Sequence, residues 1–263
     1  MLIYIKGAGD LASGIALRMH HARFDIVMTD LLVPTAVRRT VAFSEAIRLG
    51  STVVEDVSAE KAETAEQIRD CLSRDVIPVV PVPAAGIIDS FHPEVIIDAI
   101  IAKENLGTRI DDAPMVIGVG PGFTAGEDCH AVIETKRGHT LGRVIWKGSA
   151  IPNTGIPGEI GGETVNRVLR APEDGIFHPA KDFGDIVHHG DICAYIDGNP
   201  VFAATGGIVR GMLQDGVPVT KGFKCGDIDP RGVVVDYRTV SDKAMAIAGG
   251  VLEAVMSYAG NRL

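Results

Sequence analysis

The sequence predicts an α/β N-terminal domain with a Rossmann-like parallel sheet, followed by a mainly β domain and a closing α-helix. Over the first hundred residues, short β-prone runs alternate with helix-like segments, which is typical of parallel strands joined by right-handed crossovers. After about Leu106 the chain consists of short runs rich in glycine, proline, valine and isoleucine. This texture predicts a small β-barrel or sandwich. We therefore expect a nucleotide-binding domain at 1–110, a β domain at 111–240, and a helix within 241–263 that packs back on the first domain.

The composition limits the classes of partner. The chain has 263 residues, 46% hydrophobic and 22% charged, with a net charge of −9, which is ordinary for a globular protein and argues against nucleic acid as a partner. The longest uncharged apolar stretch, Val76 to Ile88, is about 13 residues, below the ~20 needed to cross a bilayer. We expect no membrane segment and no signal peptide. The four cysteines form no CxxC pair, so a cytoplasmic protein with reduced thiols is the default expectation.

Strand and helix signals alternate along the first domain. Leu2 to Lys6 predicts a strand, and apolar residues at helical spacing predict a helix over Leu11 to His21 with Asp10 as its N-cap. Further strands are expected at 26–28, 52–54, 77–80 and 95–100, and further helices at 35–47 and 59–72.

The second half offers few helix signals. Between Val116 and Val235 we expect only a short helix, near 162–168. The segment from Ser241 to Tyr258 then predicts a helix with Ser241 as N-cap. Its Gly249-Gly250 pair costs roughly 1–2 kcal/mol in helix propensity, so we expect this helix to approach another backbone closely.

A glycine loop opens the first predicted helix. The pattern Gly7-x-Gly9-x-x-Ala12 follows a predicted strand, the context in which it indicates dinucleotide binding. The first glycine permits the tight turn, the second lets a pyrophosphate approach, and Ala12 lets the helix pack on the strand. The predicted helix starts near Asp10. The phosphate would meet the unpaired N–H groups of this first turn, at the positive end of the helix dipole.

Asp30 is the acidic partner that this pattern requires. It closes the second predicted strand 21 residues after Gly9, where an acid accepts hydrogen bonds from a ribose hydroxyl and favours NAD over NADP. Arg38 and Arg39 follow closely and offer a phosphate partner instead. Asp98, at the carboxyl end of an apolar strand, is either a ligand contact or a helix cap. A glycine turn that has lost its ligand is the alternative for the whole set.

A second glycine-rich segment, 118–126, has four glycines in nine residues. Successive N–H groups of such a loop can form an anion-binding nest, and we expect Gly120 and Gly122 to contact the cofactor. The polar residues that follow include three candidates for substrate contact: Glu134, Arg137 and His139.

The reactive side chains give no diagnostic catalytic set. Cys129 beside His130 suggests an activated thiol, but adjacent residues on a strand point to opposite faces, and a structural role for each is the alternative. No ligand spacing indicates a metal site. The catalytic residues, and whether the protein is an enzyme, stay open.

Residues 170–232 resemble the barrel-sandwich hybrid of biotinyl and lipoyl domains. A Gly-Asp-x-Val turn begins at Gly184, and a second glycine–valine turn lies at Asp215 to Val219. Carrier domains of this type place a modifiable lysine at the hairpin between their halves, whereas that hairpin here reads Asp197-Gly198-Asn199. We therefore expect a rigid binding or docking module.

Six strings spread over the chain are specific when taken together: residues 7–14, 38–46, 118–123, 134–142, 226–231 and 241–244. Together they resemble the selenium-dependent molybdenum hydroxylase accessory protein family (YqeB type). The resemblance implies a cytoplasmic maturation factor whose partner is a molybdenum hydroxylase related to xanthine dehydrogenase.

The motifs and the resemblance lead to one functional expectation. We expect an accessory factor that binds a small phosphate-bearing ligand, namely NAD(P), another nucleotide, or the pyrophosphate-bearing molybdenum cofactor as a transient ligand. One alternative is an NAD(P)-dependent oxidoreductase, although no Tyr-x-x-x-Lys pair stands out. The other is a non-catalytic scaffold that docks the hydroxylase. The sequence leaves a homo-oligomer open.

Overall fold

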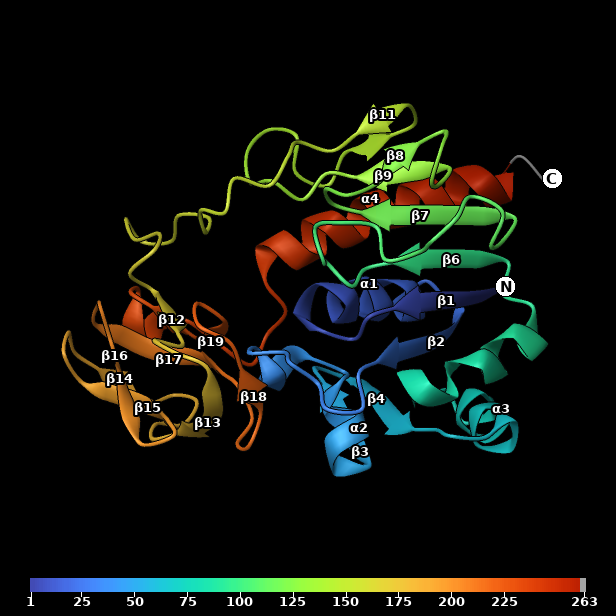
Figure 1. The fold of residues 1–263 in the computed structure, drawn as a ribbon. Helices are drawn as coiled ribbons and strands as arrows, with labels where there is room; N and C mark the ends of the chain where they lie inside the picture. The colour runs from blue at the N-terminus through green and yellow to red at the C-terminus, as the bar shows by residue number, and fades with distance from the viewer. Residues whose placement is uncertain (261–263) are drawn as a thin grey trace. The chain divides into compact units, whose positions relative to one another are not determined.

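The computed structural model describes residues 1–260 and divides into two compact units (Figure 1). Unit 1 comprises Met1–Pro34, Val41–Thr154 and 240–260, and unit 2 comprises Thr35–Thr40 and Gly155–Thr239. These bounds differ from the expected domains, because residues 111–154 continue unit 1 and a short N-terminal segment belongs to unit 2. None of the helices within residues 1–260 is long and apolar enough to cross a membrane.

Unit 1 is built on a nine-stranded mixed sheet in the order β10-β9-β7-β6-β1-β2-β5-β4-β3. Neighbours from β9 through β4 are parallel, and the outer pairs β10/β9 and β3/β4 are antiparallel. The strands are β1 (Leu2–Lys6), β2 (Asp25–Asp30), β3 (Ser51–Val54), β4 (Val57–Lys61), β5 (Ile77–Pro81), β6 (Val95–Asp98), β7 (Met115–Val119), β9 (Ala131–Ile133) and β10 (Val144–Ile145).

Alternating side chains bury both faces of this sheet. Ile3 and Ile5 belong to the largest core, which α1 (Asp10–His21), α2 (Glu45–Leu49) and α4 (Asp242–Gly260) cover. On the opposite face, α3 (Ala65–Ser73) and the 3-10 helix η2 (Val82–Phe91) cover one part. A small core around Phe123, with the short strands β8 (Thr124–Ala125) and β11 (Gly148–Ser149), covers another.

The expected fold class is wrong for unit 1. A Rossmann-like sheet requires a helical crossover between successive parallel strands. Within residues 1–260, the connections that follow β5, β6 and β7 contain no α-helix, and both edges of the sheet are antiparallel. The strands beyond residue 110, expected in a β domain, extend this mixed sheet instead.

The expected barrel-sandwich hybrid at 170–232 is also wrong. Unit 2 holds two separate four-stranded antiparallel sheets, in the strand orders β12-β19-β17-β14 and β16-β15-β13-β18. Phe177, Val209 and Ile228 lie in their shared core. The turn at Asp197 and Gly198 joins the neighbours β15 and β16 rather than two halves. The strands are β12 (Val168–Arg170), β13 (Gly175–Pro179), β14 (Ile186–Val187), β15 (Ile192–Ile196), β16 (Asn199–Phe202), β17 (Gly207–Met212), β18 (Pro218–Val219) and β19 (Lys224–Asp229).

Several expected helices differ from those observed. In place of a helix at 35–47 the chain forms the 3-10 turn η1 (Arg39–Val41) and then α2. The first residues of the expected helix 59–72 pair as β4, and α3 starts later, where a capping box between Thr64 and Gln67 satisfies its first N–H groups. The expected helix at 162–168 is absent, because Val168 begins β12 and η3 (Gly232–Val234) is the one helical turn described in Gly155–Thr239.

The closing helix α4 packs against α1 at close range. Ser241 caps it, since the Ser241 Oγ accepts a hydrogen bond from the Ala244 N–H at 3.2 Å. A Cβ added at Gly250 would lie 1.9 Å from the Gly142 carbonyl oxygen, and one added at Gly14 of α1 would lie 2.8 Å from the Ala244 Cβ. Small residues at these positions therefore allow two backbones to approach α4.

Candidate functional site

The glycine loop between β1 and α1 is a three-residue turn held from several sides. Gly7 has a φ of +96°, and a Cβ there would lie 2.8 Å from the Ala99 carbonyl oxygen, so only glycine fits. The Ala8 carbonyl accepts hydrogen bonds from the Ser44 N–H (2.9 Å) and the Ser13 hydroxyl (3.1 Å). Two of the strings that carry the family resemblance, 7–14 and 38–46, thus meet at this loop, because Ser44 belongs to the second of them.

Gly9 leaves the helix N-terminus open. Gly9, rather than the expected Asp10, is the N-cap of α1, and no side chain caps the helix. A Cβ added at Gly9 would meet no atom within 4 Å. The N–H groups of the first helical turn, which begins at Asp10, lack intrahelical partners and carry the positive end of the dipole. Ala12 is buried, so its small side chain serves the packing of α1.

Asp30 lies beside this loop at the end of β2. Its Oδ2 accepts a hydrogen bond from the Ala8 N–H, and its Oδ1 accepts one from the Leu31 N–H, both at 2.7 Å. Burial raises the pKa of Asp30, and the two backbone hydrogen bonds partly offset this effect. Since an ionised carboxylate accepts about four hydrogen bonds, the Asp30 carboxylate keeps acceptor capacity for ligand hydroxyls.

Three exposed apolar side chains follow Asp30 directly. Leu31, Leu32 and Val33 are 50%, 56% and 52% exposed. Sequence reasoning missed them, although an apolar run immediately after a strand-ending acid was a visible signal. They offer an apolar surface for a flat ring next to the carboxylate.

Arg38 and Arg39 lie in unit 2, not in the unit that holds the glycine loop. The Arg38 guanidinium donates to the backbone carbonyls of Tyr237 and Thr239. The Arg39 Nε donates to the Met212 carbonyl at 2.9 Å. The structure gives both residues a role in holding unit 2 together, and phosphate binding by them stays a prediction.

Asp98 ends β6 and is buried. Its Oδ2 accepts a hydrogen bond from the Thr108 hydroxyl at 2.7 Å, and its Oδ1 accepts one from the Ile100 N–H at 3.2 Å. The Thr108 hydroxyl in turn accepts from the Lys6 Nζ at 2.7 Å. No helix follows β6, so the helix-cap alternative is wrong. Sequence reasoning missed Lys6, which the parallel pairing of β1 with β6 places opposite Asp98, and Thr108, which lies in the connection after β6.

Within segment 118–126, Gly120 and Gly122 are required for close packing. A Cβ at Gly120 would lie 2.9 Å from the Thr135 hydroxyl oxygen, and one at Gly122 would lie 2.7 Å from the Glu104 Cα. Both glycines also have positive φ. These contacts account for the two glycines without a ligand, and an anion-binding nest stays a prediction.

The three candidates for substrate contact differ in environment. Glu134 is 2% exposed, and its carboxylate accepts hydrogen bonds from three backbone N–H groups, those of Thr135, Lys136 and Ile151. The Arg137 guanidinium forms a two-pronged ion pair with Asp242 at 2.8 and 3.0 Å. His139 is exposed. Glu134 and Arg137 thus support the loops around them, and substrate contact stays a prediction for all three.

Cys129 is not an activated thiol. It is fully buried, and burial raises its pKa to about 11, so little thiolate exists near neutral pH. The His130 Nδ1 accepts a hydrogen bond from the Val116 N–H at 3.0 Å. The structural alternative therefore holds for both residues. Within the described part of the chain, no three His, Cys, Asp or Glu side chains gather in a group that could hold a metal ion.

Comparison with known proteins gives one strong match. No family model matches the chain. The chain is 52% identical over 255 residues to the "Uncharacterized protein YqeB" of Escherichia coli (strain K12), covering 97% of this chain and 47% of that protein. The chain thus spans about half the length of this relative. The match supports the YqeB-type resemblance.

The solved structures that resemble this chain do so weakly. An aspartoacylase family protein from Mesorhizobium loti is 13% identical, with 86% of this chain and 83% of that chain covered and a TM-score of 0.27. A succinylglutamate desuccinylase from Silicibacter is 12% identical, with 86% and 84% covered and a TM-score of 0.25. At these TM-scores neither carries an argument about this chain.

Proposed function

Because the chain is related to YqeB over nearly its whole length, we propose that it is an accessory factor in the maturation of a selenium-dependent molybdenum hydroxylase. In this role it binds a nucleotide or the pyrophosphate-bearing molybdenum cofactor at the loop that includes Gly9. The open, uncapped start of α1 at Gly9 is the observation that carries the binding proposal. The resemblance supports the accessory role.

The phosphate end of the ligand is assigned to the first turn of α1. Unpaired N–H groups and the helix dipole favour an anion at this position. Apart from its neighbours Ala8 and Asp10, no residue comes within 4 Å of a Cβ added at Gly9, so a phosphate can approach the backbone. Gly7 and the hydrogen bonds to the Ala8 carbonyl fix the shape of the turn before any ligand arrives, which limits the entropy lost on binding.

The remaining parts of a nucleotide find chemically matched groups nearby. The Asp30 carboxylate is fixed by the Ala8 and Leu31 N–H groups and accepts hydrogen bonds from ribose or other ligand hydroxyls. The exposed run from Leu31 to Val33 provides an apolar surface for a purine or pterin ring. Anion, hydroxyl and ring sites in this succession fit a nucleotide better than they fit inorganic phosphate.

Equilibrium titration tests the binding proposal. Isothermal titration calorimetry with NAD, NADP, ATP and molybdopterin nucleotide should reveal binding of at least one of them to the wild-type protein. Gly9→Trp fills the space of the phosphate and should abolish that binding. Gly249→Trp is the matched control, because a Cβ at Gly249 of α4 also meets no atom within 4 Å; it should bind as the wild type does. Absence of binding for all four ligands would refute the proposal.

The accessory role needs a separate test. The hydroxylase would be produced together with the wild-type protein or with Gly9→Trp, and its activity measured after purification. A ligand-dependent accessory factor predicts inactive hydroxylase with Gly9→Trp and active hydroxylase with Gly249→Trp. Equal activity with both variants would contradict a ligand-dependent role and favour a scaffold.

A further inference from the structure

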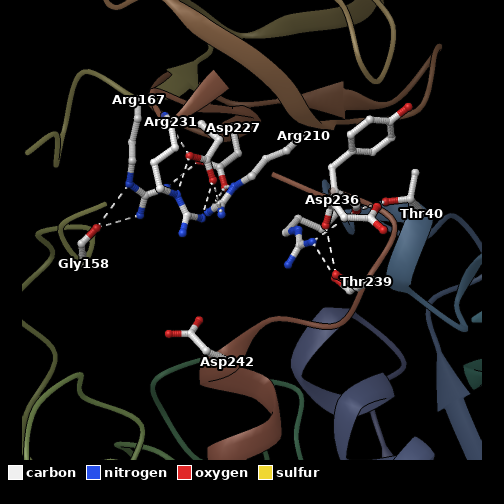
Figure 2. A network of polar contacts seen from close by, with 12 residues as sticks. Thr40, Gly158, Arg167, Arg210, Asp227, Arg231, Asp236, Thr239 and Asp242 are labelled. Atoms are coloured by element: carbon white, nitrogen blue, oxygen red, sulfur yellow. Dashed lines mark hydrogen bonds and ion pairs between the residues drawn. The ribbon is translucent and has the colours of Figure 1, made fainter. Parts of the chain in front are cut away.

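Charged side chains gather around Asp227 in unit 2 (Figure 2). Three arginines form ion pairs with this aspartate or with Asp229: Arg167, Arg210 and Arg231. Burial alone would raise the pKa of Asp229, but the hydrogen bonds from Arg231 and the positive charge of Arg210 outweigh burial and lower it. Because carboxylates already hold these guanidiniums, the network holds unit 2 together rather than forming a binding site.

The glycine turn of unit 1 has a second flank, which the proposed function does not use. β1 lies between β2 and β6 in the sheet (Figure 1). Asp30 and the exposed apolar run follow β2, so they lie on one side of the turn. On the other side, a Cβ at Gly7 would lie 2.8 Å from the Ala99 carbonyl oxygen and 3.1 Å from the Ile100 Cα. The connection after β6 therefore packs directly against the turn.

Lys6, the last residue of β1, forms hydrogen bonds with the connection after β6. Its Nζ donates to the Thr108 hydroxyl at 2.7 Å and to the Asp112 Oδ2 at 3.4 Å. Within residues 1–260 these are the two acceptors of the Lys6 ammonium, which has three N–H groups. The Lys6 side chain is 21% exposed, so the third N–H is open to solvent and to a ligand.

The charge of Lys6 is already balanced. Asp112 lies 3.4 Å from the ammonium, and the buried Asp98 is linked to it through the hydroxyl that Lys6 binds. Burial opposes the ionisation of Asp112, but the backbone N–H of Arg109 and the charge of Lys6 outweigh burial and lower its pKa. Arg109 pairs with Asp111 as well as with Asp112, so this group has one carboxylate more than it has cations. The open N–H therefore favours a neutral oxygen acceptor, and the group as a whole disfavours an anion.

An exposed apolar side chain completes this flank. Ile100 is 43% exposed, and its N–H donates to the Asp98 Oδ1 at 3.2 Å. On the β2 side, Leu31 is likewise exposed, and its N–H donates to Asp30. Each side of the turn thus combines a polar group with an apolar side chain, as sites for polar rings do. A ligand with one ring would leave one side of the turn unused.

Given the binding proposed at Gly9, we propose that the ligand is a nicotinamide dinucleotide and that Lys6 donates a hydrogen bond to its carboxamide oxygen. A dinucleotide has a pyrophosphate between two rings, which matches a phosphate position at the first turn of α1 between two flanks. The carboxamide is neutral and the oxidised nicotinamide ring is positively charged, so both suit a group with an excess carboxylate. ATP has no second ring, and the metal end of the molybdenum cofactor is anionic. Lys6 is then a specificity-determining residue.

Titration calorimetry with NAD and ADP-ribose tests this role, because ADP-ribose lacks the nicotinamide ring. The wild-type protein should bind NAD about tenfold more tightly than ADP-ribose, as expected for one hydrogen bond from a charged donor. Lys6→Met should bind the two ligands equally. Lys61→Met is the matched control and should keep the preference: Lys61 also ends a strand, β4, and pairs with Glu63 at 3.0 Å, but β2 and β5 separate β4 from β1. Since the preference is a ratio within one variant, partial unfolding of Lys6→Met affects both ligands alike.

Acetylation of the wild-type protein gives a second readout that needs no variant. With acetic anhydride and peptide mass spectrometry, saturating NAD should suppress the acetylation of Lys6, whereas saturating ADP-ribose should leave it unchanged. Lys61 should react equally with either ligand present.

The outcomes separate this role of Lys6 from the proposed function. Equal affinities of the wild type for NAD and ADP-ribose, an unchanged preference in Lys6→Met, or equal acetylation of Lys6 with both ligands would overturn it. Binding of ATP or molybdopterin nucleotide without binding of NAD would also overturn it, while ligand binding at Gly9 would stand. Absence of binding for every nucleotide would refute the proposed function itself, and the role of Lys6 with it.

Discussion

The contact between α4 and the loop before β10 gives the sharpest stability prediction. Gly249 and Gly250 are neighbours in α4, yet their surroundings are opposite. A Cβ at Gly249 would meet nothing within 4 Å, whereas a Cβ at Gly250 would lie 1.9 Å from the Gly142 carbonyl oxygen. We therefore expect Gly249→Ala to stabilise the protein and Gly250→Ala to destabilise it.

The magnitudes follow from propensity and packing. Alanine in place of glycine inside a helix gains about 0.8–1 kcal/mol, and Gly249→Ala should show this gain. At Gly250 the Gly142 carbonyl would have to retreat by about 1.5 Å to reach an ordinary contact of 3.4 Å. That retreat is opposed by the hydrogen bond from the Gly142 N–H to the Glu134 carbonyl at 2.9 Å. Overpacking costs about 1–3 kcal/mol or more. Since both positions gain the same helix propensity, the two variants should differ by this overpacking cost, about 1–3 kcal/mol or more.

Thermal unfolding followed by circular dichroism measures this difference. At about 2–4 °C per kcal/mol for a chain of this size, the midpoint of Gly250→Ala should lie at least about 2 °C below that of Gly249→Ala. Equal midpoints, or a Gly250→Ala protein more stable than the wild type, would show that α4 does not approach Gly142 as described.

Three further predictions concern buried groups. The lowered pKa of Asp229 means that its contribution to stability is present above its unfolded pKa of about 3.9. That contribution is lost as the pH falls through its folded pKa, so the urea midpoints of wild type and Asp229→Asn should differ at pH 7 and converge in acid. Glu134→Gln places an amide NH₂ against a backbone N–H donor and should cost about 1–3 kcal/mol in urea unfolding; an unchanged midpoint contradicts the hydrogen bonds described. Burial raises the pKa of Cys129, Cys193 and Cys225 to about 11, so these thiols should react with Ellman's reagent at pH 8 only after unfolding, and rapid reaction of the native protein would contradict their burial.

Local signals in the sequence were sufficient for the start of the chain. The strand Leu2–Lys6 and the helix that ends at His21 are confirmed, because a β-prone run, a glycine turn and helical periodicity all lie within about twenty residues. The N-cap was misplaced by one residue, since the Gly9 backbone rather than the Asp10 side chain begins the helix. The helix cap at Ser241 is confirmed for the same local reason.

Where secondary structure depends on partners far away in the sequence, the predictions were wrong. Residues 59–61, the first of the expected helix 59–72, instead complete β4, because β3 and β5 supply hydrogen-bonding partners on both sides. The strands beyond residue 110 show β propensity whether they join an antiparallel domain or extend a mixed sheet, so the expected fold class failed at this point. Which strand pairs with which is decided by tertiary packing.

The features of the candidate site also differ in whether the sequence could predict them. The sequence by itself determined the glycine turn, the acid at Asp30 and the small residues of α4, because each is required by backbone geometry within a short stretch. The tertiary structure alone decided that Asp98 bonds to Thr108, that Glu134 holds three backbone N–H groups, and that Arg231 pairs with the buried Asp229. A charged side chain has the same sequence signature whether it is buried or exposed, and only the residues that fold against it fix its partners.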